Sequence, residues 1–138
     1  MGEHYCIEYL EQPAWEVIGR GIREYNTGQA GDGHAIFLCF VLYDPDLTIV
    51  GGIIGETHWN WMFINLMWIR EDLRGCGYGH QLLEAAEEEG RKRGAAHAYL
   101  DTFSFQAPEF YKKHGYKVFG VLEDFPPGHQ RYYLTKPL

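Results

Sequence analysis

The chain has 138 residues, 46% of them hydrophobic and 22% charged, which is the composition of a soluble globular protein. This length fits one domain with a substantial core, so we expect residues 1–138 to form a single domain. The formal net charge of −7 excludes the surplus of Lys and Arg that nucleic-acid binding requires, and it favours cationic partners.

The spacing of cysteines and histidines argues against a disulfide framework or a metal site. Cys6, Cys39 and Cys76 fit neither pattern, and no two of the seven histidines have paired-ligand spacing on a helix. The longest apolar stretch, residues 35–43, is far shorter than the ~20 residues of a membrane span. The N-terminal residues also lack the pattern of a signal peptide. We therefore expect a cytoplasmic protein with no metal and no membrane contact.

The first elements in chain order are a strand, a helix and a loop. Residues 6–10 alternate like a short strand. Pro13 suits a helix start, and apolar residues recur at roughly helical spacing as far as Asn26. Residues 27–33 contain three glycines and are expected to form a loop. Three strands joined by short turns follow, at residues 36–43, 48–57 and 61–69, and they predict an antiparallel meander.

The pattern then changes to alternating helices and strands. Residues 79–93 have helical periodicity, and Gly94 ends that helix. Its expected inward residues are Leu82, Leu83, Ala86 and Gly90, and its expected outward residues are Glu84, Glu87, Glu88, Arg91 and Lys92. The remaining elements are a strand at 96–103, a helix at 108–114, and strands at 116–122 and 130–135. This order predicts an α/β (α+β) fold with a central mixed, mostly antiparallel sheet flanked by helices.

The segment Arg74-Gly75-Cys76-Gly77-Tyr78-Gly79 joins an apolar strand to a helix. Glycines allow a ligand close to the backbone, and the first helical turn adds unpaired N–H groups and a positive dipole end. Together they predict a site for a pyrophosphate. The segment is not a Walker A loop, because no Lys follows the glycines. It is not a dinucleotide fingerprint either, because the glycine spacing differs and a meander precedes it.

This segment resembles the Arg-x-x-Gly-x-Gly signature of the GNAT (Gcn5-related) N-acetyltransferases. The resemblance extends to the preceding Met67-Trp68-Ile69. It continues in Ala107-Pro108-Glu109-Phe110-Tyr111-Lys112-Lys113-His114-Gly115-Tyr116, which looks like the family's Ala-x-x-Phe-Tyr-x-x-x-Gly-Phe/Tyr element. The order and separation of the two blocks match as well. The resemblance implies the acyl-CoA N-acyltransferase fold and an acetyl-CoA-dependent activity.

The resemblance assigns the coenzyme contacts by position. The backbone from Gly75 through Cys76, Gly77, Tyr78 and Gly79 to His80 would hold the pyrophosphate, and Arg74 belongs to the same coenzyme-binding segment. Met67 and Ile69 would pair through their main chains with the pantetheine arm, as an added strand does, and Trp68 between them belongs to the same coenzyme-binding segment. This requires the strand to splay from its neighbour at a bulge. Ser104 stands where the family often has a coenzyme-binding Asn, so that contact is either missing or supplied by Gln106.

Two residues are the candidates for the chemistry. Tyr111 falls where many family members keep a tyrosine beside the leaving sulfur, although it is also a plausible core aromatic. Glu56 is the preferred general base for removing a proton from the amine, with His58 and Asp101 as rivals. Trp59, Trp61 and Phe105 are either an aromatic wall for a cation or packing residues.

The resulting hypothesis is an N-acetyltransferase that transfers acetyl from acetyl-CoA to a primary amine by direct attack in a ternary complex. Cys76 lacks an evident base partner, so it is not expected to carry an acyl group. The alternatives are a non-catalytic acyl-CoA-binding regulatory module and a purely structural domain. The expected acceptor is a small-molecule or peptide amine, with a preference for cations. The short segment 26–33 leaves the acceptor pocket open or completed by a second subunit, and homodimers are common in the resembled family.

Overall fold

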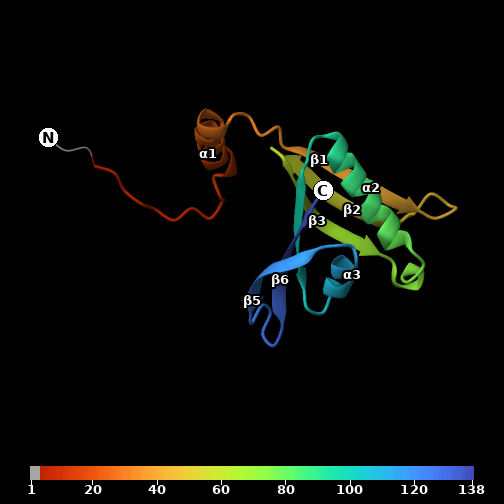
Figure 1. Cartoon of the computed structure of the whole chain (residues 1–138). Coiled ribbons are helices and arrows are strands. Elements are labelled where there is room, and N and C mark those ends of the chain that lie inside the picture. The colour runs from red at the N-terminus through yellow and green to blue at the C-terminus, as the bar shows by residue number, and fades with distance from the viewer. Residues whose placement is uncertain (1–3) are drawn as a thin grey trace. The chain divides into compact units, whose positions relative to one another are not determined.

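The structure is a computed structural model that describes residues 4–138. The chain divides into two units, the first ending at Gly33 and the second being His34–Leu138. The described part of the first unit, residues 4–33, contains one helix, α1 (Trp15–Ala30), labelled in Figure 1. The strand predicted at residues 6–10 is wrong, because that segment has no regular structure. A run of five alternating residues is a strand only when a partner pairs with it.

The loop predicted at residues 27–33 is shorter than expected. α1 continues to Ala30, so the cost of about 1 kcal/mol for a glycine inside a helix does not end it at Gly28. The helix ends instead at Gly31, which has φ 80° and donates its N–H to the Thr27 carbonyl at 2.9 Å. Glycine adopts a positive φ without steric cost, which lets the chain leave the helix at this residue.

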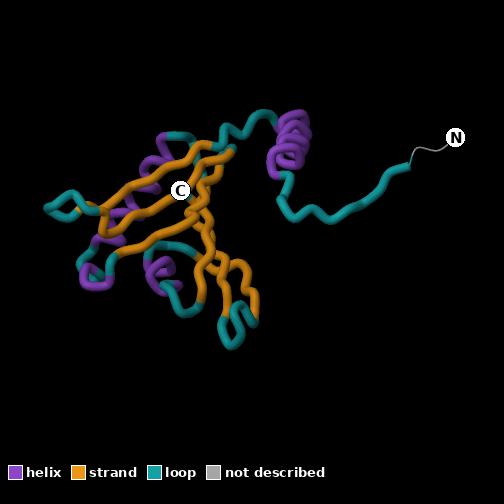
Figure 2. The backbone as a smooth tube through the Cα atoms, turned by 180° about the vertical axis from the view of Figure 1, so that it is seen from behind, coloured by secondary structure: helices purple, strands orange, loops and turns teal. Residues whose placement is uncertain are grey.

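The second unit is built on a six-stranded sheet with the order β1-β2-β3-β4-β6-β5. Figure 2 shows the strands of this sheet in orange. Its strands are β1 (Ile36–Tyr43), β2 (Ile49–His58), β3 (Trp61–Ile69), β4 (His97–Phe103), β5 (Lys117–Glu123) and β6 (Gln130–Pro137). Only β3 and β4 pair in parallel, so the predicted mixed, mostly antiparallel sheet and its meander are confirmed. The expected bounds of β1 and β3 are confirmed as well.

Helix α2 (Tyr78–Lys92) lies along one face of β1, β2 and β3, as Figure 1 shows. The predicted inward residues Leu82, Leu83, Ala86 and Gly90 are all buried. They pack with sheet residues that share one face, namely Leu38, Ile53, Met62, Ile64, Ala98, Leu100 and Leu134. Gly90 is required there, because a Cβ at this position would lie 2.8 Å from the sulfur of Met62. A short 3-10 helix, η1 (Glu71–Leu73), precedes α2, and α3 (Pro108–Lys113) follows β4.

Glu87 is a correction to the predicted helix surface. It was expected to face outward with its neighbours, but only 5% of it is exposed. Its carboxylate accepts a hydrogen bond of 2.8 Å from the Tyr116 hydroxyl, and Lys136 Nζ lies 3.0 Å from the same group. A charge in the core is tolerated when it is paired and hydrogen-bonded. These partners lie far away in the sequence, so the local charge pattern does not reveal them.

The two parallel strands separate halfway along their length. The β3–β4 pairing runs from Trp61↔His97 to Ile64↔Leu100 and stops there, although both strands continue. On the other side of β3, Ile54 pairs with Leu66 and Gly55 with Ile64, so Asn65 is an extra, bulged residue. A bulge bends its strand and changes its twist. The splay that the sequence resemblance required is therefore confirmed, and its position is fixed at Asn65.

Candidate functional site

The splay leaves one side of β3 without a strand partner. The Arg70 N–H donates to the Val50 carbonyl of β2 at 2.9 Å. Main-chain groups of successive residues in a strand point to alternate sides, so Met67 and Ile69 direct theirs away from β2. This is the side that β4 leaves after Leu100. Trp68 instead faces β2 with its main chain, and its side chain is exposed.

The main-chain groups of Met67 and Ile69 are therefore open to an extended ligand. The Ile69 carbonyl already accepts a hydrogen bond of 2.8 Å from Arg74 Nε. Arg74 thus ties the glycine-rich segment back to the end of β3. A carbonyl oxygen has two lone pairs, so this bond leaves room for one more donor.

The glycines of this segment have different structural roles. Gly75 has φ 77° and Gly77 has φ 89°, and a Cβ at either position would meet no atom within 4 Å. Both glycines therefore adopt a backbone conformation that other residues avoid, next to open space. Gly77 caps α2 without a side-chain hydrogen bond, which leaves the first N–H groups of the helix available. This arrangement fits a pyrophosphate.

Gly79 instead permits close packing between helices. A Cβ there would lie 3.2 Å from Cε1 of Phe110 and 3.3 Å from Cδ1 of Ile69. The first turn of α2 is thus in contact with α3 and with the end of β3. This packing places the residue after Phe110, Tyr111, beside the splayed strands, within the same core cluster.

Tyr111 is 7% exposed and packs edge-on against Phe110 and Tyr116. Within residues 4–138 its hydroxyl has no hydrogen-bond partner, and no fully buried side-chain oxygen of these residues lacks one. The hydroxyl therefore reaches the surface although the ring is buried. Burial, with a smaller effect from the charge of Asp101, raises the pKa of Tyr111 to about 12. The Tyr111 hydroxyl therefore keeps its proton at neutral pH.

Glu56 lies beside the splay on the other face of the sheet. It pairs with Phe63, which pairs with Tyr99, in the row just before the last β3–β4 pair. Its neighbours Gly55 and Thr57 are buried on the α2 side, so Glu56 points away from α2. Burial, followed by the charges of Glu56 and Asp101, raises the pKa of Tyr99. The carboxylates of Glu56 and Asp101 therefore both lie close enough to Tyr99 for their charges to affect it.

The two carboxylates differ in their partners. Asp101 accepts hydrogen bonds from Arg131 Nε at 2.9 Å and Nη2 at 2.7 Å. Glu56 forms no hydrogen bond or ion pair with the described part of the chain. The Asp101 carboxylate is thus occupied by the Arg131 guanidinium, whereas no side chain of the described residues occupies the Glu56 carboxylate. The geometry thus favours Glu56 over Asp101 as a base.

The remaining aromatic candidates do not form a single wall. His58 and Trp59 contact each other, Trp61 stacks on His97, and Phe105 stacks on Phe103. His97 and Phe103 are the two ends of β4, about 20 Å apart at 3.3 Å per residue. Trp61 and Phe105 therefore lie at opposite ends of the sheet face.

Ser104 and Gln106 both have partners within the fold. Ser104 Oγ accepts the Gln130 N–H at 3.1 Å, and Gln106 Oε1 accepts the Phe103 N–H at 2.8 Å. These bonds hold the turn after β4, and a coenzyme contact by either side chain stays a prediction. Cys76 is exposed, and its sulfur lies 3.8 Å from the Arg74 carbonyl.

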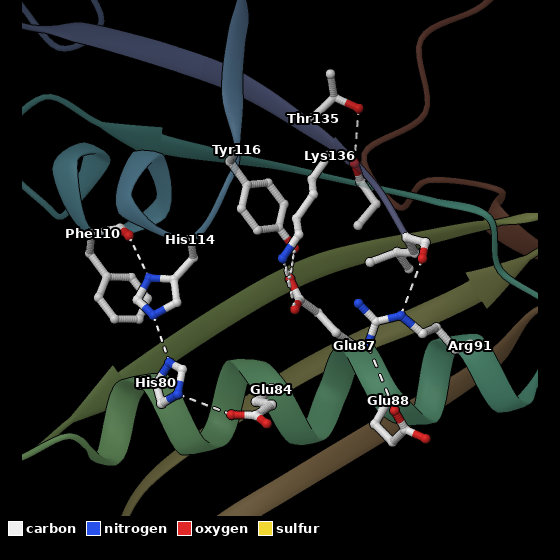
Figure 3. A network of polar contacts seen from close by, with 12 residues as sticks. His80, Glu84, Glu87, Glu88, Arg91, Phe110, His114, Tyr116, Thr135 and Lys136 are labelled. Carbon is white, nitrogen blue, oxygen red and sulfur yellow. Dashed lines mark hydrogen bonds and ion pairs between the residues drawn. The ribbon is translucent and has the colours of Figure 1, made fainter.

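A chain of polar contacts between α2 and α3, shown in Figure 3, was not predicted from the sequence. His80 Nδ1 lies 2.8 Å from His114 Nε2, and His80 Nε2 lies 3.0 Å from Glu84. His114 Nδ1 lies 2.7 Å from the Phe110 carbonyl. The spacing of four between His80 and Glu84 was a usable signal. The contact between the two histidines, 34 residues apart, had none.

Comparison with known proteins identifies the class to which this fold and site belong. The acetyltransferase (GNAT) family model matches residues 4–116, and the chain belongs to this family. It is therefore an N-acetyltransferase, and acetyltransferases of this family use acetyl-CoA.

Individual relatives agree with this assignment. Acetyltransferase Atu2258 of Agrobacterium fabrum is 33% identical over 129 residues, which cover 94% of each chain. Blasticidin-S acetyltransferase of Streptomyces morookaense is 35% identical over 91 residues, covering 65% of this chain and 67% of that protein. The crystal structure of an acetyltransferase from Bacillus cereus has a TM-score of 0.86 at 34% identity, covering 95% of this chain and 98% of the other.

No helix in residues 4–138 is long and apolar enough to cross a membrane. The same residues contain no group of three or more His, Cys, Asp and Glu side chains arranged to hold a metal ion.

Proposed function

We propose that this enzyme transfers the acetyl group of acetyl-CoA directly to a primary amine, with both substrates bound at once. The observation that carries this proposal is the separation of β3 and β4 after Ile64 and Leu100, next to the glycine-lined start of α2. The separation provides an open strand side for the pantetheine arm. The helix start provides N–H donors for the pyrophosphate.

Within this site, residues 75–80 would surround the phosphates with backbone N–H groups. The main chains of Met67 and Ile69 would pair with the pantetheine amides. The Met67 N–H would donate to the thioester oxygen and bind it more strongly as negative charge develops there. A donor of this kind contributes roughly 3–4 kcal/mol to transition-state stabilisation.

The proposed base and the proposed sulfur partner lie on opposite faces of the sheet. Glu56 would take a proton from the amine on the face away from α2, directly or through water. Tyr111 would meet the departing sulfur from the α2 side. Its pKa of about 12 lies well above the ~8.5 of an ordinary thiol. A hydrogen bond to the thiolate is therefore favoured over complete proton transfer.

The acceptor that we propose is a small-molecule amine carrying positive charge. The net charge of −7 and the unpaired carboxylate of Glu56 support a cation, and the similarity to blasticidin-S acetyltransferase supports a small molecule. We further propose a cytoplasmic enzyme, a homodimer, and one catalytic domain over residues 1–138. The family match from residue 4 to 116 runs through both units and supports the single domain.

Calorimetry followed by a turnover assay tests this function. Acetyl-CoA should bind with micromolar affinity, and a panel of primary amines should include acceptors that release free coenzyme A thiol. Binding without thiol release from any amine would favour the non-catalytic acyl-CoA-binding module. A folded protein that does not bind acetyl-CoA would contradict the proposal.

A further inference from the structure

Helix α3 carries Tyr111 but has only six residues, so its position depends on what holds it. Short helices owe their stability to packing rather than to their own hydrogen bonds. Phe110 packs against Gly79 and Ile69 on one side of α3. At the end of the helix, His114 contacts His80, and this is a polar side-chain link to the first turn of α2.

The chain of contacts constrains the protons on the two imidazole rings. The Phe110 carbonyl can only accept, so His114 Nδ1 must donate to it. The ionised Glu84 carboxylate also only accepts, so His80 Nε2 must donate to it. One further proton lies between His80 Nδ1 and His114 Nε2, at a separation of 2.8 Å. All three contacts are hydrogen bonds only when the four ring nitrogens carry three protons, one more than two neutral imidazoles have.

The charges around the pair are consistent with this added proton. Glu84, on α2, supplies the balancing negative charge. On α3, Lys112 is held by Glu109 at 3.0 Å, which reduces its repulsion of the histidines, and Lys113 is the other cation of that helix. Charge-assisted hydrogen bonds are stronger than neutral ones. The link is therefore better suited to fixing α3 than an uncharged contact would be.

We propose that His80 and His114 are positioning residues, which share one proton and hold α3 so that the Tyr111 hydroxyl meets the sulfur of the coenzyme. This inference rests on the proposed function. It assigns the histidines no contact with the acceptor and no role as the base. Their effect on catalysis passes through Tyr111.

A double-mutant cycle tests this route. His114→Ala should lower kcat about tenfold and change the acetyl-CoA Kd less than about twofold, because the effect is one of orientation. In the Tyr111→Phe background, where the hydroxyl is absent, the same change should alter kcat less than about twofold. Equal losses of kcat in the two backgrounds, or a loss confined to acetyl-CoA binding, would overturn the proposal.

Three variants of exposed or partly exposed side chains complete the design. The His80 side chain is 57% exposed, so His80→Ala should fold and should reproduce the loss of kcat. His80→Asn retains a donor close to Nδ1 and should recover most of it. Lys112→Ala breaks an ion pair of α3 but not the link to α2, and should leave kcat unchanged.

Nitrogen-15 NMR of the imidazole rings checks the protons without using activity. In the free protein at neutral pH, the four ring nitrogens of the pair should show three protons, with His114 Nδ1 protonated. A spectrum with two protons on the pair would overturn the shared charge. Absence of acetyl transfer by the wild-type protein would instead contradict the proposed function, so the two failures are distinguishable.

Discussion

The Tyr116 hydroxyl donates a hydrogen bond of 2.8 Å to the Glu87 carboxylate in the core, joining the residue before β5 to the middle of α2. Lys136 of β6 approaches the same carboxylate, with its Nζ 3.0 Å away. Burial and the nearby negative charge of Glu87 both raise the pKa of Tyr116. One carboxylate of α2 is thus bound by β6 and by the segment that precedes β5.

Glu87→Gln should lower the free energy of unfolding by about 2–3 kcal/mol, measured by urea denaturation. The substitution leaves Lys136 without its counter-charge in a partly buried position, and removing one member of such a pair is costly. Glu88→Gln is the matched control. Glu88 follows Glu87 in α2, and the substitution breaks only its exposed ion pair with Arg91. It should change the stability by less than about 0.5 kcal/mol. Equal effects of the two changes would contradict the buried network.

Two substitutions at one glycine separate charge from backbone strain. Gly77→Asp and Gly77→Asn place nearly identical side chains at φ 89°, so they strain the helix start to a similar extent. Only Asp adds a negative charge at the proposed pyrophosphate site. By calorimetry, Asp should weaken acetyl-CoA binding at least about tenfold more than Asn does, since like charges repel at short range. Equal affinities in the two variants would place the pyrophosphate elsewhere.

The sequence predicted those elements whose signals are local. The apolar residues of β1 form an uninterrupted run, and those of β3 are interrupted only by Asn65. Short turns delimit both strands, so their bounds were predictable. The glycines of residues 75–79 were identified as a ligand-binding segment. Their division of roles was not, because the contact of Gly79 with Phe110 requires the packed fold.

The failures of prediction involve partners that are distant in the chain. Glu84, Glu87 and Glu88 look alike in the sequence, yet only Glu87 is buried, because Tyr116 and Lys136 reach it. The contact between His80 and His114 was missed for the same reason. Residues 6–10 were predicted to form a strand but form none. The sequence pattern of a segment limits which secondary structure it is able to form, whereas its tertiary contacts determine which structure it adopts.

Glu56→Gln should reduce kcat about 10²- to 10⁴-fold near neutral pH, which is the usual effect of removing a general base. Without the carboxylate, the reaction depends on amine that is already deprotonated. The kcat/KM of the variant should therefore rise close to tenfold per pH unit from about pH 7 to 9, given an ordinary amine pKa near 10.4. The wild-type profile should be flatter over this range.

Asp101→Asn is the comparison for the choice of base. It leaves Glu56 in place but removes the partner of Arg131, so it should lower stability more than activity. A steep pH profile in Asp101→Asn, combined with a flat one in Glu56→Gln, would reverse the assignment of the base.

The raised pKa of Tyr111 makes the stability of the protein dependent on alkaline pH. The pKa is about 12 in the folded chain and 10.0 ordinarily, so below pH 10 the phenol is protonated in both states and its contribution to stability is complete. As the pH rises from 10 towards 12, the unfolded chain loses the proton first and the free energy of unfolding falls. Between about pH 8 and 11, Tyr111→Phe should therefore lose about 1.4 kcal/mol less stability than the wild type, measured by urea denaturation. The control is Tyr43→Phe, at an exposed position of β1, which should lose as much stability over this pH range as the wild type. If Tyr111→Phe loses the same amount as that control, the Tyr111 phenol is not desolvated in the folded state.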